Sequence, residues 1–391
     1  MKFYTSVLPY RGRLLVRGVD KDGAQKKYRI NYKPSLFVPV GKETKYKTLD
    51  GRYVERIKFD SMPEATKWVN EYKNVTNFEY FGNTRHQYPF IADEFKGKID
   101  WDMNKIKLLT IDIECESENG FPSPEKADQP LICITVKDHT TKKIIVFGMG
   151  NFVNDREDVQ YINCVTETGL VETFTKFWVE YNPDIITGWN VKFFDIPYLM
   201  NRFRYLMGDE WLNQFSPWGI VEQKSASVLF ASREQQVWNI MGVDTLDYLD
   251  LYRKFTFVRR ESYKLDYIGE VELGQNKLDN PYDTFKEFYS NDYQRFVEYN
   301  IQDVELVDKL EDKLQLIALF LTMAYEAKVN YQDVFGQVRI WDCIIYHHLR
   351  SKNIVPPAVQ ESKTSSGYEG AYVKDPVVGF HDWVCSFDLN S

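Results

Sequence analysis

Acidic residues that could bind metal ions occur at three separated places in the chain. In the first, Asp112 and Glu114 alternate with Ile111 and Ile113 in an otherwise apolar run. Residues i and i+2 of a strand lie on the same face, about 6.6 Å apart, so both carboxylates would point toward one place while the isoleucines enter the core. The same alternation is also typical of a half-exposed strand without a chemical role.

Two further acids stand at predicted helix positions. Asp195 comes just before Ile196-Pro197, where a strand exit meets a helix entrance, so it suits either a metal site or an N-cap. Asp303 follows Tyr299 by four residues and shares a helical stripe with Val307. Because a bare carboxylate is costly to bury, Asp303 needs a cation, or the helix must turn it outward.

Together the four acids could hold two hard cations through oxygen, an arrangement that catalyses phosphodiester hydrolysis. Two ions about 3.5–4 Å apart activate a water and stabilise the leaving 3′ oxygen, and no His or Cys is required. The Tyr299 hydroxyl could orient the attacking water. The sequence therefore predicts a site for Mg²⁺ or Mn²⁺.

The predicted elements would bring these acids together. Strands are expected at 107–114, 131–137, 143–147 and 184–187, and helices at 170–181 and 196–207, which favours a mixed α/β domain with a central sheet. Before it, we predict a hairpin of 13–19 and 27–32 and a helix over 62–72 capped by Ser61. After it, we predict one long helix over 292–328 and a final strand at 384–389.

Length and composition exclude several classes of protein. The 391 residues suggest two or three domains, and 43% hydrophobic residues are ample for packed cores. No apolar run is long enough for a membrane helix and no signal peptide is evident, so we expect a soluble intracellular protein. The five cysteines are scattered without CxxC spacing, which argues against disulfides and a zinc site.

The net charge of −8 hides an asymmetry. Residues 1–107 contain 22 Lys+Arg against 13 Asp+Glu, whereas the rest contains 27 against 44. The basic residues of 1–107 could bind a phosphate backbone, and the acidic remainder of the chain is expected if carboxylates are gathered there to bind metal ions. Ordinary solvated surface charge explains the same numbers.

Three segments resemble the exonuclease motifs of the DEDDy nucleases: 112–114 (DIE), 190–195 (NVKFFD) and 299–303 (YNIQD). The resemblance implies a ribonuclease-H-like fold. It also implies that Asp112, Glu114, Asp195 and Asp303 bind the metals and that Tyr299 positions the water.

Residues 244–255 (DTLDYLDLYRKF) and 264–270 (KLDYIGE) resemble family B DNA polymerases of the T-even bacteriophage type, and the similarity covers nearly the whole chain. The resemblance places Lys277 beside the scissile phosphate and Phe121 on the single-stranded primer end. Arg233 lies in a segment similar to the tip of the strand-separating hairpin, where Ala231 replaces an expected glycine. Asn190 and Phe194 are further candidate DNA contacts, the aromatic ring through stacking on bases.

Two C-terminal segments resemble polymerase elements. Tyr368 and Gly370, in 368–371 (YEGA), match a segment that contacts the template strand between the two active sites. Asp388, in 386–391 (SFDLNS), matches the metal-binding acid that starts the first polymerase motif. The rest of that motif is absent, so we expect the polymerase site in this chain to be incomplete.

We thus expect an N-terminal domain (1–107, re-entered at about 317–359), an exonuclease domain (108–316) and a linker with the start of the polymerase palm (360–391). The predicted function is 3′-5′ proofreading hydrolysis of single-stranded DNA, releasing mononucleotides. Alternatively, the chain is the nucleic-acid-binding and assembly half of a split polymerase that needs a second polypeptide, or it acts on RNA.

Expected partners are single-stranded and primer-template DNA and a C-terminal polymerase fragment. By family resemblance we add a sliding clamp and replisome proteins. The expected location is the cytoplasm of a bacterial host, without a membrane.

Overall fold

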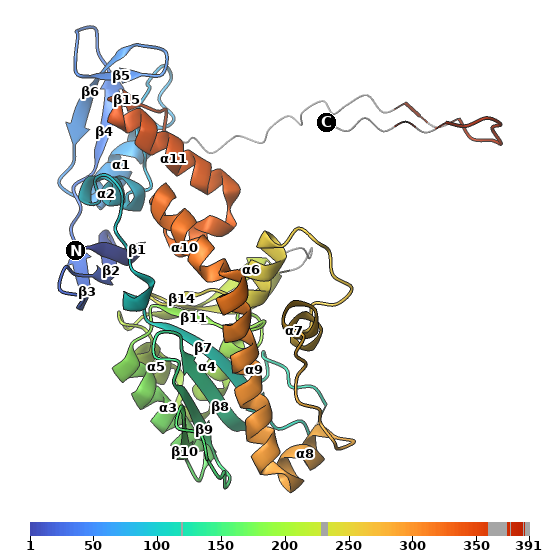
Figure 1. The fold of residues 1–391 in the computed structure, drawn as a ribbon. Coiled ribbons are helices and arrows are strands. Elements are labelled where there is room, and N and C mark those ends of the chain that lie inside the picture. Colours follow the sequence, from blue (N-terminus) through green and yellow to red (C-terminus); the bar gives the residue numbers. More distant parts are fainter. Residues whose placement is uncertain (119, 228–233, 359–373, 376, 386, 388–391) are drawn as a thin grey trace.

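The computed structural model describes residues 1–391 except 119, 228–233, 359–373, 376, 386 and 388–391. The molecule is elongated (Figure 1). A small sheet that contains β4, β5 and β6 lies at one end, the larger sheet lies at the other, and β1, β2 and β3 lie between them. The helices α9, α10 and α11 run between the two ends.

The larger sheet is mixed and has the strand order β10-β9-β8-β7-β11-β14. β8 runs antiparallel to β7 and β9, and the other neighbouring pairs are parallel. This sheet, flanked by helices, confirms the predicted α/β fold of the ribonuclease-H-like type. Its strands are β7 (Leu108–Cys115), β8 (Leu131–Asp138), β9 (Ile144–Gly148), β10 (Val159–Asn163), β11 (Ile185–Thr187) and β14 (Asp244–Thr245).

Helices cover both faces of this sheet. α3 (Glu167–Tyr181) and α4 (Asp195–Met207) pack on one face, in a buried cluster that includes Ile111 and Ile113 of β7. α9 (Tyr293–Leu314) packs on the opposite face, against β7, β8 and β9. Because side chains of a strand alternate, the acids of β7 lie on the α9 side, as predicted.

The N-terminal part contains a three-stranded sheet, β1-β2-β3, and a four-stranded sheet, β15-β5-β6-β4. β2 and β3 pair antiparallel, which confirms the predicted hairpin. The last strand, β15, returns from far along the chain to pair with β5. The strands are β1 (Phe3–Tyr10), β2 (Arg13–Val19), β3 (Gln25–Ile30), β4 (Ser35–Pro39), β5 (Tyr46–Thr48), β6 (Tyr53–Lys58) and β15 (Ile354–Val355).

The helix predicted at 62–72 is confirmed as α1 (Met62–Tyr72), and the Ser61 hydroxyl accepts the Glu64 N–H at 3.3 Å as its cap. A separate hairpin of β12 (Val221–Ser227) and β13 (Glu234–Ile240) leaves the larger sheet after α4. The remaining helical segments are α2 (Gln87–Glu94), η1 (Met103–Lys105), α5 (Asp209–Leu212), η2 (Asn213–Phe215), α6 (Tyr248–Phe255), α7 (Leu265–Leu273), α8 (Phe285–Asn291), α10 (Leu316–Ala327), η3 (Tyr331–Phe335) and α11 (Gln337–Ser351).

The single long helix predicted at 292–328 is wrong, because the structure divides it into α9 and α10. Gln315 ends α9 in the left-handed region, with φ 52°. The buried Glu311 carboxylate accepts the N–H groups of Ile317 and Ala318 and so satisfies the first turn of α10. No glycine or proline marks this break, and the break is stabilised by a side chain four residues earlier.

A buried arginine joins the N-terminal sheet to the larger one. Arg17, on β2, is 1% exposed and lies 3.3 Å from the carboxylate of Asp184. Its guanidinium also donates to the backbone carbonyls of Asn182, Pro183 and Gly242, at 2.5–2.8 Å. The hairpin predicted from the sequence is therefore anchored on the sheet that carries the acids.

The final strand predicted at 384–389 is wrong for the residues that the structure describes. Residues 384, 385 and 387 lie in no strand, and their side chains are exposed. Residues 386, 388 and 389 of this prediction lie outside the described residues. Among the described residues, no helix has the length and apolar character to cross a bilayer. The three domain boundaries stay predictions.

Candidate metal centre

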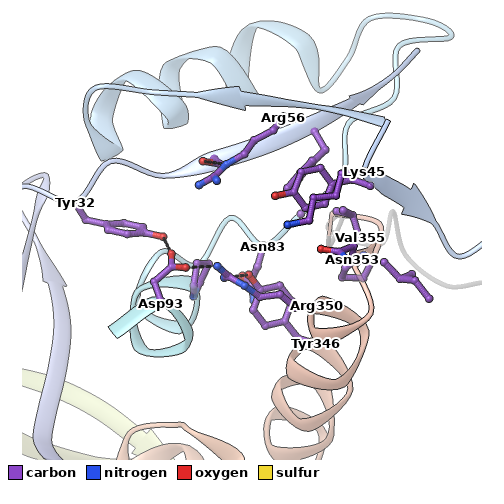
Figure 2. Close-up of a pocket in the computed structure, with 16 residues that line it drawn as sticks. Tyr32, Lys45, Arg56, Asn83, Asp93, Tyr346, Arg350, Asn353 and Val355 are labelled. Carbon is purple, nitrogen blue, oxygen red and sulfur yellow. Dashed lines mark hydrogen bonds and ion pairs between the residues drawn. The ribbon is translucent and has the colours of Figure 1, made fainter. Parts of the chain in front are cut away.

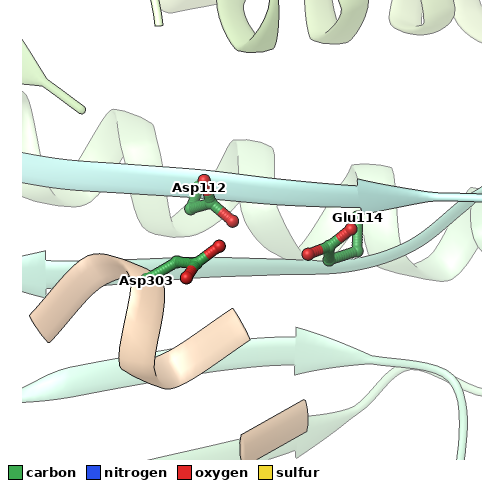
Figure 3. A group of neighbouring side chains, drawn as sticks. All are labelled: Asp112, Glu114 and Asp303. Atoms are coloured by element: carbon green, nitrogen blue, oxygen red, sulfur yellow. The ribbon is translucent and has the colours of Figure 1, made fainter. Parts of the chain in front are cut away.

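Three of the four predicted acids form a tight group. Asp112 and Glu114 project from β7 on one side, and Asp303 approaches them from α9 (Figure 3). One carboxylate oxygen from each lies within 4.8 Å of the others. Of these residues, Asp303 is 3% exposed, and the other two are half-buried. Elements nearly 200 residues apart thus form one acidic site.

Asp195, the fourth acid, lies next to this group but is not part of it. It is the first residue of α4, and its carboxylate accepts the backbone N–H of Ile113 at 3.1 Å. That N–H stands between the two acids of β7. The alternative role as N-cap is wrong, because Phe194 occupies the N-cap position. Asp195 is 3% exposed and faces the strand that carries the other acids.

The acids are crowded in a poorly hydrated space, which disfavours their charged forms. Burial raises the pKa of Asp112, and the negative charges of Asp195 and Asp303 raise it further. Burial also raises the pKa of Glu114 to about 8 and that of Asp195 to about 7. The pKa of Asp303 is raised by burial although the charge of Lys277 opposes it. Divalent cations would relieve this repulsion.

Lys277 and Tyr299 border the group at Asp303. The Lys277 ammonium forms an ion pair with the Asp303 carboxylate and donates to the Tyr299 hydroxyl at 3.3 Å. Burial alone would lower the pKa of Lys277, but the charge of Asp303 raises it, so the amine stays protonated. Burial raises the pKa of Tyr299, so its hydroxyl stays neutral. The second Asp303 oxygen, Oδ1, is buried and has no hydrogen-bond partner among the described residues.

Asn300 also belongs to the site, although no role for it is predicted from the sequence. Its side-chain amide donates to Asp112 Oδ2 at 2.5 Å, which ties α9 to β7 at the acids. Asn300 is completely buried. Its position three residues before Asp303, on the same helical face, was the available signal.

A second residue without an assigned role, Asp247, shapes the loop that leads to Asp195. Its buried carboxylate accepts the N–H groups of Asn190, Lys192 and Leu249, each at 3.0 Å. Asn190 adopts the left-handed region, with φ 65°. These bonds fix the turn from which Asp195 enters α4. Spacing alone contained no signal for this contact between distant segments.

The predicted DNA contacts divide into those near the acids and those outside the described residues. Phe121 is 85% exposed, and its ring centroid lies 5.4 Å from that of Phe194, one residue before Asp195. Asn190 is half-buried in the same loop. The remaining positions, Arg233, Tyr368, Gly370 and the polymerase-motif acid Asp388, lie outside the described residues.

Residues 65–268, just over half of the chain, match the family described as DNA polymerase family B, exonuclease domain. The chain therefore belongs to the family B DNA polymerases and carries their exonuclease domain. Asp112, Glu114 and Asp195 lie within the matched residues, whereas Tyr299 and Asp303 follow them.

The similarity to particular polymerases extends over the whole chain. This chain is 33% identical to the DNA-directed DNA polymerase of Escherichia phage RB69 and 29% identical to that of Enterobacteria phage T4. Each alignment covers 100% of this chain and 46% of the relative. It is 30% identical to the DNA polymerase delta catalytic subunit of Caenorhabditis elegans, over 71% of this chain and 27% of that relative. The predicted T-even type is thereby confirmed, and the chain spans about half the length of these phage relatives.

Proposed function

We propose that this chain is a metal-dependent 3′-5′ exonuclease that hydrolyses the last phosphodiester of single-stranded DNA and releases mononucleotides. The observation that carries the proposal is the meeting of Asp112, Glu114 and Asp303 within 4.8 Å, on a domain of the family B exonuclease type. As part of a phage DNA polymerase, it would remove misincorporated nucleotides from the primer end.

The residues present fit two Mg²⁺ or Mn²⁺ ions. All candidate ligands are carboxylate oxygens, which hard cations prefer. Asp303 Oδ1 is buried without a hydrogen-bond partner in the described part of the chain, and this oxygen and the raised pKa values of Glu114 and Asp195 support a cation in this space. We assign Asp112, Glu114, Asp195 and Asp303 as ligands. The ions would activate the attacking water and stabilise the leaving oxygen.

The neighbouring side chains would position the substrate. Tyr299, held neutral and within reach of the Lys277 amine, would orient the attacking water through its hydroxyl. Lys277 would contact the scissile phosphate when a cation takes over the charge of Asp303. Phe121 and Phe194 would stack on terminal bases, with Asn190 beside them.

The test is digestion of a 5′-labelled single-stranded DNA with Mg²⁺, with EDTA, and by an Asp112→Ala/Glu114→Ala variant. We expect stepwise shortening from the 3′ end only for the unaltered protein with metal. The matched control is Glu298→Gln, because Glu298 is an exposed acid on α9 and should not affect the rate. Equal activity of the double variant, or activity in EDTA, would refute the assignment.

The direction of digestion and the preference for deoxyribose over ribose are tested with separate substrates. A 3′-labelled strand should lose its label as a mononucleotide at the first step, whereas a label that stays on progressively shorter strands would indicate digestion from the 5′ end. Comparing deoxyribose with ribose 3′ ends tests the RNA alternative, since only the 2′-hydroxyl differs.

A second candidate function, the binding half of a split polymerase, is favoured by exposed apolar residues on α11. Val338, Trp341 and Ile345 share one face of this helix and are 75%, 61% and 51% exposed. Copurification with a fragment that contains the polymerase portion of the relatives, and recovery of nucleotide incorporation, would support it. An incorporation rate unaffected by this chain would contradict it.

Further partners rest on the family resemblance and are proposals as well. They are single-stranded and primer-template DNA, a sliding clamp and other replisome proteins. The proposed location is the cytoplasm of an infected bacterium. Pull-down from phage-infected cells with the unaltered chain and a Val338→Glu variant would test the protein partners.

A further inference from the structure

Helix α4 holds the loop 116–130, which connects β7 to β8 and carries Phe121. The described residues of this loop lie in no helix or strand, so its backbone groups need partners elsewhere. Three side chains of α4, here called the loop clamp, each donate to a backbone carbonyl of the loop. They are the Tyr198 hydroxyl to Gln129 at 2.5 Å, the Asn201 amide to Pro124 at 2.7 Å and the Arg202 guanidinium to Ala127 at 3.1 Å.

The loop clamp is buried. Tyr198 is 0% exposed, Asn201 7% and Arg202 5%. Because a buried donor that loses its acceptor costs free energy, each contact favours one conformation of the loop. Glu167 of α3 fixes Arg202 further, since its carboxylate accepts two guanidinium N–H groups at 2.7 Å and the Leu131 N–H at 2.8 Å. The loop, α3 and α4 are therefore one connected unit.

A row of aromatic rings joins the same helix to Phe121. The ring centroid of Phe194, the residue before α4, lies 5.4 Å from that of Phe121 and 5.9 Å from that of Tyr198. Tyr198 thus supports Phe194 with its ring and holds the far end of the loop with its hydroxyl. Because Phe121 is 85% exposed, burial of its own ring does little to fix its position.

The first residue of α4 is Asp195, one of the proposed metal ligands. The loop clamp follows it within two turns of the same helix. A single rigid helix therefore connects the acidic site, where the phosphodiester would be cut, to the loop that carries the exposed aromatic ring.

We propose that the loop clamp positions the substrate: it fixes the loop so that Phe121, beside Phe194, is a preformed platform for a base at the 3′ end of the strand. This inference rests on the proposed function, because its ligand is the single-stranded DNA that the acids would hydrolyse. A preformed platform binds the strand without the entropic cost of ordering the loop. Weakening the clamp should therefore weaken strand binding, and only through Phe121.

The test measures the affinity of the full chain for a 5′-fluorescein-labelled single strand by anisotropy in EDTA, where no metal supports hydrolysis. The clamp variants are Tyr198→Phe, which removes only a hydroxyl, and Tyr198→Phe/Asn201→Leu, which nearly keeps the side-chain volume. Each is also made together with Phe121→Ala, so that a double-mutant cycle isolates the effect transmitted through Phe121. Circular dichroism and urea unfolding verify folding. If the two-site variant does not fold, Tyr198→Phe alone supplies the cycle.

The matched control is Tyr32→Phe, which removes the same group from a half-buried tyrosine in the N-terminal part. Tyr32 lines a cavity of about 240 Å³, and its hydroxyl donates to Asp93 at 3.0 Å (Figure 2). None of the described residues of the loop 116–130 lines this cavity. The control should therefore leave strand binding unchanged.

We expect Tyr198→Phe to weaken strand binding by about threefold and the two-site variant by about tenfold, as the loss of one and two hydrogen bonds allows. With Phe121→Ala present, the same substitutions should change the affinity by less than about twofold. Equal weakening with and without Phe121, weakening by Tyr32→Phe, no weakening by either clamp variant, or no strand binding by the unaltered chain would overturn the proposal. Coupled binding by a chain that does not digest DNA would support the clamp and refute only the exonuclease assignment.

Discussion

Crowding of the carboxylates should make the metal-free protein less stable as the pH rises. Glu114 has an ordinary pKa of 4.5 and a pKa of about 8 in the folded chain. Between these values the folded state binds the proton more often than the unfolded state, so the free energy of unfolding falls as pH rises through this window. At about 1.4 kcal/mol per pH unit, a fully dry group would lose about 5 kcal/mol. Because Glu114 is only half-buried, we expect about 2 kcal/mol.

The assay is urea unfolding in EDTA at pH 5, 6, 7 and 8 for the unaltered chain and for Glu114→Gln. The amide cannot ionise, so the variant should gain stability relative to the unaltered chain as the pH rises, by about 2 kcal/mol at pH 8. Saturating Mg²⁺ should stabilise only the unaltered chain at high pH. Glu298→Gln is the control and should follow the unaltered chain. A difference that does not grow with pH would refute the reasoning about crowding.

Four further substitutions test individual contacts. Tyr299→Phe should lower kcat by about 10- to 100-fold with little change in KM, measured by single-turnover digestion, because only the water-orienting hydroxyl is lost. Asp247→Ala should lower activity by about tenfold or more and reduce the melting temperature, since three backbone N–H groups lose their acceptor; unchanged kinetics would contradict its positioning role. Arg17→Met should cost about 3–5 kcal/mol in urea unfolding because the buried Asp184 carboxylate loses its cationic partner and keeps only neutral hydrogen-bond donors. Phe121→Ala should raise KM for single-stranded DNA by about tenfold through lost stacking and leave kcat nearly unchanged.

Much of the local structure was predictable from the sequence. The two-residue period of a strand determines that Asp112 and Glu114 share a face, and β7 confirms it. The capped helix α1 and the β2–β3 hairpin begin close to where their cap and turn residues predict. These features depend on neighbours in sequence, whose relative geometry is set by covalent bonds and a few dihedral angles.

The breaks and ends of helices and strands were less predictable from the sequence where distant or buried groups determine them. Gln315 resembles an ordinary helix residue, yet the chain turns there, and the Glu311 carboxylate accepts the first backbone N–H groups of the next helix. The expected strand at 384–389 has suitable residues but no neighbouring strand among the described residues. A strand exists only when another strand accepts its hydrogen bonds.

The sequence by itself therefore determined which side chains could bind metal ions, which local elements hold them and, through its motifs, the family of the chain. Only the tertiary structure decided that Asp303 lies beside Asp112 and Glu114 and that Asn300 joins α9 to β7. It also decided that Lys277 forms an ion pair with Asp303. The raised pKa values likewise arise from burial and from charges contributed by other elements. The reason is physical: spacing along the chain specifies direction within one element, whereas distance and desolvation depend on how separate elements pack.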